Sequence, residues 1–228
     1  MTITGKDGIF PDSINRRIAE ILPYRNPSTL LGEFTAHGDQ ANITASGGNI
    51  LDADSTGIFS YLQTNLIVNN SAYVDGNTQY NRQKEPAFHC RFKLNSNSNV
   101  RMFIGLTSRT SAEMVSNAIP NGSYGGLYVD TAAVGSFGTI RGSGGAFVKE
   151  FGTLGSSVDT SLHDFYMWMK KSGGLNQVSM QLDNNDRVEY TTTLPSTGAL
   201  LRYVAGIGNI SNLARRIYIA KIAINQEV

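Results

Sequence analysis

The stretch that decides the fold reads Ala87-Phe88-His89-Cys90-Arg91-Phe92-Lys93-Leu94. Apolar side chains stand at every second position, with polar or charged side chains between them. Successive side chains of a β-strand point to opposite faces, so this alternation predicts a strand with one face on a core. The pattern returns in 100–107 and in 215–225. In the last segment the pattern predicts that one face of the strand carries Ile217, Ile219 and Lys221. The opposite face is expected to carry Tyr218, Ala220 and Ile222.

Working outward from residue 87, short alternating segments separated by turn residues fill most of the chain. The expected strands are 56–62, 66–74, 87–94, 100–107, 125–131, 137–141, 146–151, 163–171, 177–183, 187–194, 200–208 and 215–225. Residues 181–188 are typical of a hairpin, and Gly142-Ser143-Gly144-Gly145 is typical of a hairpin loop. Short strands without interleaved helices predict an all-β fold, an antiparallel β-sandwich whose sheets each have one dry and one wet face.

The first thirty residues differ from the rest. Apolar residues at helical spacing predict a helix over 11–22, with the stripe Ile14, Ile18, Ile21 and Leu22. Pro23 ends this segment and a linker follows. We therefore expect an N-terminal arm at 1–30 and one sandwich domain at 31–228. The apolar stripe needs a partner, which is either the chain's own sandwich or a neighbouring subunit in a homo-oligomer.

Composition narrows the class of protein. Only 16% of the 228 residues are charged and the net charge is +1, so no basic stripe for nucleic acid is expected. Amides and hydroxyls keep such a surface soluble, as is typical of β-rich extracellular or viral proteins. One cysteine, Cys90, excludes an internal disulfide, and its alternating segment predicts a buried thiol. We expect no signal peptide and no membrane span, and hence synthesis in a host cytoplasm.

Several segments together resemble the concanavalin A-like (laminin-G-like) jelly roll over roughly residues 31–226. They are Glu85-Pro86-Ala87-Phe88, Val100-Arg101-Met102-Phe103-Ile104-Gly105-Leu106-Thr107, Gly125-Gly126-Leu127-Tyr128-Val129-Asp130-Thr131, His163-Asp164-Phe165-Tyr166-Met167-Trp168, the 178–188 hairpin and Leu194-Pro195. The sequences FIGLT at 103–107 and GLYVDT at 126–131 resemble those of concanavalin A-like domains on virion surfaces, including tail and head fibres and capsid decorations. The resemblance implies a lectin-like sandwich.

The chain departs from the hydrolases that share this fold. Laminarinase-type enzymes carry Glu-x-Asp-x-x-Glu on one strand, because retaining hydrolysis needs two carboxyl groups about 5 Å apart. That motif does not occur in the chain, so we expect no catalytic residues and no enzyme. A divergent glycosidase that depends on Glu85 or Glu150 is the least favoured alternative.

The sequence contains only weak candidates for metal-binding residues. Legume-type lectins hold calcium with clustered Asp and Asn, and here Asp52 and Asp54 or the 183–186 cluster offer oxygen ligands. Both are expected to be turn formers, with calcium as the alternative, so no cofactor is predicted. The three histidines, His37, His89 and His163, are too far apart in sequence to indicate zinc. His163 and Asp164 are adjacent, which on a strand places them on opposite faces.

Sugar binding would use an exposed aromatic ring beside amide and carboxylate groups. Asn121 with Tyr124 and Tyr73 with Asp75 fit that description, although tyrosines that pack at the sandwich rim are the favoured interpretation. Trp168 lies in an apolar segment and is expected in the core.

These observations predict a non-enzymatic virion structural or surface-display protein, such as a capsid decoration, spike or fibre. Its arm would attach or oligomerise, its sandwich would face outward, and its partners would be further copies and other virion proteins. The alternative is a carbohydrate-binding module that recognises surface glycans.

Overall fold

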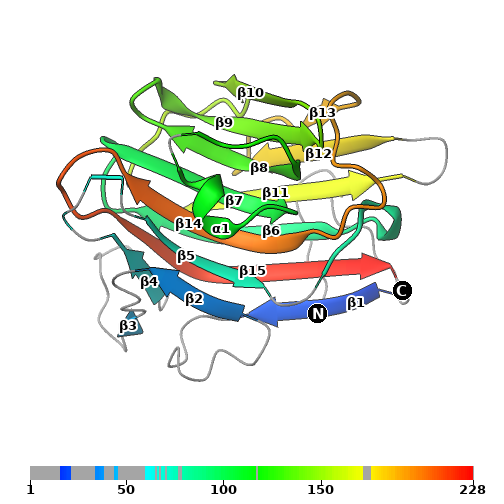
Figure 1. The fold of residues 1–228 in the computed structure, drawn as a ribbon, viewed down its shortest axis with the longest axis horizontal. Helices are drawn as coiled ribbons and strands as arrows, with labels where there is room; N and C mark the ends of the chain where they lie inside the picture. Colours follow the sequence, from blue (N-terminus) through cyan, green and yellow to red (C-terminus); the bar gives the residue numbers. More distant parts are fainter. Residues whose placement is uncertain are drawn as a thin grey trace.

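The computed structural model describes residues 16–21, 34–38, 44–45, 60–64, 66, 68–69, 71–76, 79–116, 118–171 and 176–227. In this part of the chain, two antiparallel sheets lie face to face as a sandwich (Figure 1). The first sheet has eight strands and the second has seven. The all-β sandwich predicted from the alternation is therefore confirmed.

The first sheet is built around the C-terminal strand. In order across the sheet its strands are β13 (Val188–Tyr190), β12 (Gln177–Leu182), β11 (His163–Lys170), β6 (Ala87–Leu94), β15 (Arg216–Glu227), β4 (Ser60–Gln63) and β3 (Thr44–Ala45). A further strand, β1 (Arg16–Ile21), pairs with the end of β15.

The second sheet covers the inner face of the first. Its order is β10 (Phe147–Phe151), β9 (Val134–Ser143), β8 (Ser123–Asp130), β7 (Val100–Thr107), β14 (Arg202–Asn209), β5 (Ser71–Gly76) and β2 (Phe34–Gly38). In the described residues, the connections contain two short helices, η3 (Arg82–Lys84) and α1 (Ser111–Met114).

The main core lies between the sheets, where the alternation placed it. Phe88, Cys90, Phe92 and Leu94 of β6 are at most 1% exposed and belong to one apolar cluster that strands of both sheets supply. Burial of the Cys90 thiol raises its pKa above the ordinary value. The prediction of a buried cysteine is confirmed.

A β-bulge in β15 changes which of its side chains face the core, and the predicted faces are wrong beyond it. The pairing of β15 with β6 shifts register between Ile219 and Lys221. An extra residue in one strand reverses the alternation beyond it. Ile222 consequently joins Ile217 and Ile219 in the core cluster, whereas strict alternation placed it on the opposite face.

The helix predicted over 11–22 is wrong for residues 16–21. These residues form β1, in which Ile18 lies opposite Asn225 and Ile21 lies opposite Ile222 (Figure 1). A three-turn helix is marginal by itself, whereas the part of β15 beyond its pairing with β4 offers an edge with which residues 16–21 can pair. Ile14, Leu22 and the expected boundary at residue 30 lie outside the described residues, so the arm and its attachment role stay predictions.

Part of the outer face of the second sheet is buried, whereas the alternation predicted that this face would be exposed to solvent. The connection from β7 to β8 carries α1 across this face, over β7 and β14 (Figure 1). A second apolar cluster forms beneath it from Phe103, Met114, Val115, Ile119, Tyr124, Tyr128, Ile140 and Val204. Thr110 and Glu113 form a capping box at the start of α1, a signal that was readable in the sequence.

Candidate functional site

The strand β11 divides its side chains between the core and solvent. Its buried residues alternate with partly exposed ones, so that Asp164, Tyr166, Trp168 and Lys170 point outward. Pairing with β6 and β12 surrounds them with further side chains of the same outer face. We call this surface the aromatic face, made up of His89, Asp164, Tyr166, Trp168, Ser179 and Gln181.

One half of the aromatic face is held by an ionic contact across strands. The ring of His89 stacks on Tyr166 with centroids 4.4 Å apart, and its Nε2 lies 2.7 Å from Oδ1 of Asp164. Arg91 donates to the other oxygen of Asp164 from Nε and Nη2, at 3.2 and 2.9 Å. Burial acts to raise the pKa of Asp164, but His89 and Arg91 outweigh it and leave the pKa below its ordinary value. Tyr166 is therefore fixed in orientation by its neighbours.

The other half centres on Trp168. The prediction of a core tryptophan is wrong, because Phe165, Met167 and Met169 occupy the inner face of β11 and leave Trp168 partly exposed. Its ring packs on Ala87 and lies under the Lys170 ammonium, whose Nζ is 4.8 Å from the ring centroid.

Among the polar atoms of this face, one on Trp168 and one on Gln181 are buried and unsatisfied. Within the described part of the chain, Nε1 of Trp168 and Oε1 of Gln181 have no hydrogen-bond partner. Gln181 lies opposite Tyr166, and its amide nitrogen donates to the Asn185 carbonyl at 2.8 Å. Each unsatisfied buried group costs about 1–3 kcal/mol. One donor and one acceptor thus stand beside two partly exposed rings.

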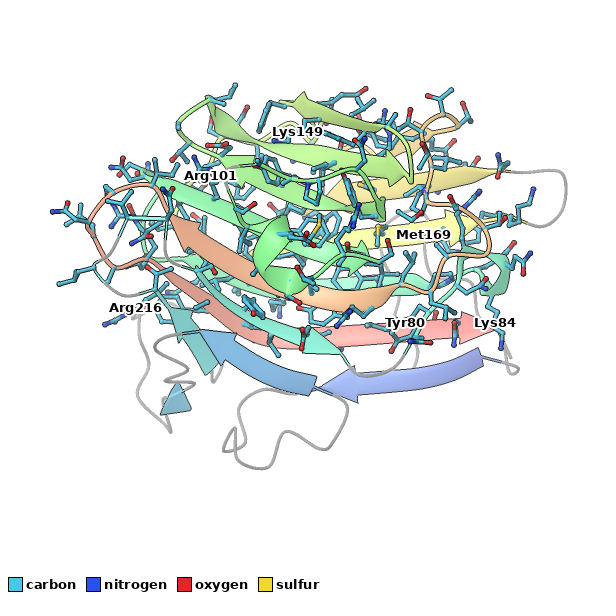
Figure 2. The ribbon with its side chains drawn as sticks, viewed as in Figure 1. Tyr80, Lys84, Arg101, Lys149, Met169 and Arg216 are labelled. Atoms are coloured by element: carbon cyan, nitrogen blue, oxygen red, sulfur yellow. The ribbon has the colours of Figure 1, made fainter. Side chains whose placement is uncertain are left out.

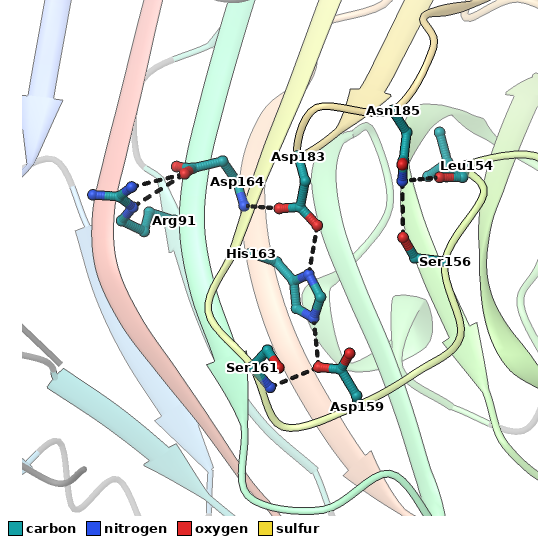
Figure 3. A network of polar contacts seen from close by, with 9 residues as sticks. All are labelled: Arg91, Leu154, Ser156, Asp159, Ser161, His163, Asp164, Asp183 and Asn185. Carbon is teal, nitrogen blue, oxygen red and sulfur yellow. Dashed lines mark hydrogen bonds and ion pairs between the residues drawn. The ribbon is translucent and has the colours of Figure 1, made fainter. Parts of the chain in front are cut away.

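A buried histidine fixes the end of β11 from which this face starts. His163 points inward, with Nδ1 2.8 Å from Asp183 Oδ2 and Nε2 3.0 Å from Asp159 Oδ1 (Figure 3). The second oxygen of Asp183 accepts from the Asp164 backbone N–H at 2.8 Å. Burial acts to lower the pKa of His163, but both aspartates outweigh it and raise the pKa above its ordinary value. The expected separation of His163 and Asp164 onto opposite faces is confirmed.

Three glutamates of the sandwich are engaged with cations or the backbone. Glu189 pairs with Arg187 at 2.9 Å, and Glu150 accepts two hydrogen bonds from Arg141 at 3.0 and 3.1 Å. Glu85 is buried and accepts from the backbone of residue 171. None of the strands in the described part of the chain carries two acidic residues.

The predicted sugar-binding residues do not converge on one surface. Tyr124 lies within β8, is 0% exposed and donates to the Pro120 carbonyl at 3.1 Å, so its ring has no open face. Asp75 is buried and accepts from the Ser111 hydroxyl at 2.7 Å, with Tyr73 partly exposed on the same strand. Asn121 is exposed, and its carbonyl accepts from Arg109. Two strands, β7 and β14, separate β8 from β5 in the sheet, and α1 lies over β5, β14 and β7.

The predicted calcium ligands Asp52 and Asp54 lie outside the described residues. Within the described ranges, no group of three or more His, Cys, Asp or Glu side chains is arranged to hold a metal ion. Asp183 of the second candidate cluster has a φ of 55°, the left-handed conformation expected of the turn between β12 and β13. No helix among these residues is long and apolar enough to cross a membrane.

Sequence reasoning missed the aromatic face, although part of its signal was present. The alternation in 163–170 places Trp168 in phase with Asp164, which is polar, and out of phase with Phe165 and Met167. The position of Trp168 in this alternation was the signal in the sequence that its side chain points outward. The contact between His89 and Asp164 had no local signal, because it joins residues on two separate strands.

Comparisons with known proteins identify the fold. No protein-family model matches the chain, and no curated protein matches it in sequence. Among solved structures, a glycoside hydrolase family 16 endo-glucanase from Bacteroides ovatus superposes with a TM-score of 0.60 at 10% identity, covering 90% of this chain and 99% of that one. The carbohydrate recognition domain of Emp47p gives a TM-score of 0.56 at 12% identity, covering 86% and 89%.

Peanut lectin gives a TM-score of 0.57 at 10% identity, with 92% of this chain and 97% of the lectin covered. At such identities the likeness shows the fold alone. The sandwich is a concanavalin A or lectin-like jelly roll, as the resemblance implied. The likeness to virion proteins is not shown by these structures.

Proposed function

We propose that this protein binds carbohydrate through the aromatic face without cleaving it. The observation that carries the proposal is the pair of partly exposed rings, Tyr166 and Trp168, beside an unsatisfied donor and an unsatisfied acceptor. Aromatic rings offer a flat apolar surface, and sugar hydroxyls both donate and accept hydrogen bonds. A glycan would thus supply what Trp168 Nε1 and Gln181 Oε1 lack, once these side chains turn toward it.

The likeness to other proteins supports sugar recognition in general. The structures with the same fold include a lectin, a carbohydrate recognition domain and a glucan-cleaving enzyme. Binding is favoured over cleavage because retaining hydrolysis needs two neighbouring carboxyl groups. On this face Asp164 is engaged with His89 and Arg91, and Glu189 is engaged with Arg187.

The test is a glycan array probed with the full chain and three variants. Trp168→Ala removes the ring and is expected to weaken binding at least about tenfold, or ~1.4 kcal/mol. Trp168→Phe keeps an apolar ring but lacks Nε1, so an intermediate loss is expected. Phe147→Ala is the matched control, because Phe147 is 38% exposed on β10 of the other sheet. It should bind like the unmodified protein.

Thermal unfolding of each variant shows whether it keeps its fold. A folded Trp168→Ala protein that binds the same glycans as Phe147→Ala would refute the aromatic face as the site. Absence of any glycan binding by the unmodified protein would refute the proposed function.

The virion role predicted from the sequence remains a second proposal. It rests on the resemblance and on the uncharged polar surface, and it is compatible with glycan binding at a host surface. Homo-oligomerisation through residues 1–30 belongs to this proposal. Light scattering of the intact chain beside a chain that starts at Leu31 tests it: a monomer in both cases would remove the argument for an oligomer.

A further inference from the structure

Among the described residues, the strand β10 has a neighbouring strand on one side only. It pairs with β9 and ends the strand order of the second sheet, and no ribbon of these residues lies beyond it (Figure 1). All five of its residues are exposed or partly exposed, with Phe147 at 38%. From this free edge we propose that β10 pairs with β10 of a second copy of the chain, in antiparallel orientation.

The backbone groups of β10 alternate between β9 and the free edge. The Ser143 N–H donates to the Ala146 carbonyl at 3.0 Å, and the Gly152 N–H donates to the Phe137 carbonyl at 2.9 Å. Both contacts continue the register of the pairing between β9 and β10. In an antiparallel ladder, alternate residues direct both of their backbone groups to the same neighbour. Even-numbered residues therefore bond to β9, whereas residues 147, 149 and 151 direct their N–H and C=O groups outward.

The charged side chains of β10 do not guard this edge. Natural sheets protect their edges with charged side chains, above all Lys, and with Pro or β-bulges. In β10 the Lys149 ammonium lies 4.7 Å from the Tyr128 ring centroid, over the second sheet (Figure 2), and Glu150 accepts two hydrogen bonds from Arg141. The strand contains no proline, and its pairing with β9 has no register shift. The edge is consequently regular and open to another strand.

The sequence of β10 favours one register for this pairing. Directly opposed residues of two antiparallel strands lie on the same face of the sheet, so the twofold axis passes through one residue of the strand. Lys149 or Glu150 on the axis would set like charges opposite each other, which is destabilising. With Val148 on the axis, the two valines meet and Lys149 lies opposite Phe147 of the second copy. These last two residues direct their backbone groups outward and would exchange both hydrogen bonds.

The pairing would join the second sheets of two copies into one continuous sheet. A twofold axis perpendicular to that sheet leaves both first sheets in one layer, so the two aromatic faces would point to the same side. If the proposed function holds, such a dimer would hold two neighbouring glycans of one surface at once, which raises the apparent affinity without a new contact. The dimer itself does not depend on that function.

Sedimentation equilibrium of the full chain tests the dimer. A five-residue edge is small for a protein interface, so we expect a dissociation constant on the order of 10–100 μM. Lys149→Pro removes an outward N–H but no hydrogen bond to β9. It should weaken the dimer at least about thirtyfold, because each dimer loses two hydrogen bonds. Lys149→Gln and Phe147→Ala keep every backbone donor and should dimerise within about threefold of the unmodified protein.

Disulfide trapping tests the register and does not depend on the proline variant. In the proposed pair the Cα atoms of the two Val148 residues are about 4.5 Å apart, within the range of a disulfide. Val148→Cys should therefore form a covalent dimer on mild oxidation. Ala146→Cys is the matched control, because Ala146 is more exposed than Val148 but its two copies would be roughly 14 Å apart. Cys90 is buried and should not react.

The outcomes decide the inference without a sugar ligand. A single-copy mass up to about 500 μM, with Val148→Cys trapped no faster than Ala146→Cys, would overturn it. A dimer that a folded Lys149→Pro protein retains, and in which both cysteines are trapped equally, would show that another surface joins the copies and would overturn it as well. Thermal unfolding shows whether Lys149→Pro is folded, and if it is not, the trapping result decides. An empty glycan array would overturn the proposed function and leave the dimer standing.

Discussion

The Asp183→Asn substitution tests the buried ionic contact that fixes the start of β11. The Asp183 carboxylate accepts from the His163 ring at 2.8 Å and from the Asp164 backbone N–H at 2.8 Å (Figure 3). Asparagine retains one acceptor oxygen but loses the charge. A hydrogen bond to a charged group contributes about 1.5–3 kcal/mol and a neutral one about 0.5–1.5. We therefore expect a loss of about 1–2 kcal/mol, or about 2–8 °C in Tm for a chain of this size.

The loss should depend on pH in a defined direction. The pKa of His163 is raised in the folded protein, so the folded state binds more protons than the unfolded state above the ordinary histidine value. The stabilisation is fully present below about pH 6.5 and is lost as pH rises through the folded pKa. The difference between the unmodified protein and Asp183→Asn should accordingly be largest near pH 5.5 and shrink toward pH 8.5.

Urea unfolding followed by the fluorescence of the single tryptophan, Trp168, measures this difference across that pH range. Asp186→Asn is the control, because Asp186 is exposed in the same turn. NMR titration of the His163 ring reports its pKa directly. A difference that stays constant from pH 5.5 to 8.5, or an Asp183→Asn protein as stable as Asp186→Asn, would refute the reasoning.

Three further outcomes are expected. Gly105→Ala should destabilise the protein by roughly 2 kcal/mol or more in chemical unfolding, since a Cβ there would collide with the backbone of β8; Gly135→Ala, with nothing within 4 Å, should be neutral, and equal effects would contradict this. Ser111→Ala should cost about 1–2 kcal/mol, because it removes the buried 2.7 Å hydrogen bond to Asp75; an unchanged Tm would argue against that bond. Cys90 should react with a thiol reagent only as fast as the whole protein unfolds, and rapid labelling under native conditions would disprove its burial.

Much of the sandwich was predictable because strand alternation is a local property. The bounds predicted for β6 and β7 agree with the structure, and the inner residues of β6 form part of the core. The turns at Asp183 and Gly144 were predictable as well, since Asp, Asn and Gly tolerate the positive φ that these positions adopt. Nothing beyond a few neighbouring residues is needed for such inferences.

The predicted binding residues show why the site could not be found in the same way. Tyr124 had suitable neighbours in sequence, but the α1 connection covers that side of the second sheet and buries its ring. Trp168 has apolar neighbours, yet the two methionines of β11 occupy the core and turn the indole outward. Which face of a sheet is covered depends on segments that are distant in sequence.

The sequence by itself thus determined the all-β class, most strands and the residues that fill the inner face. The tertiary structure decided three things: residues 16–21 became a strand, Ile222 turned into the core after the bulge, and His89 met Asp164. The reason is that alternation follows from the geometry of one strand, whereas each of these outcomes depends on the pairing of strands far apart in the chain. The aromatic face arises from that pairing.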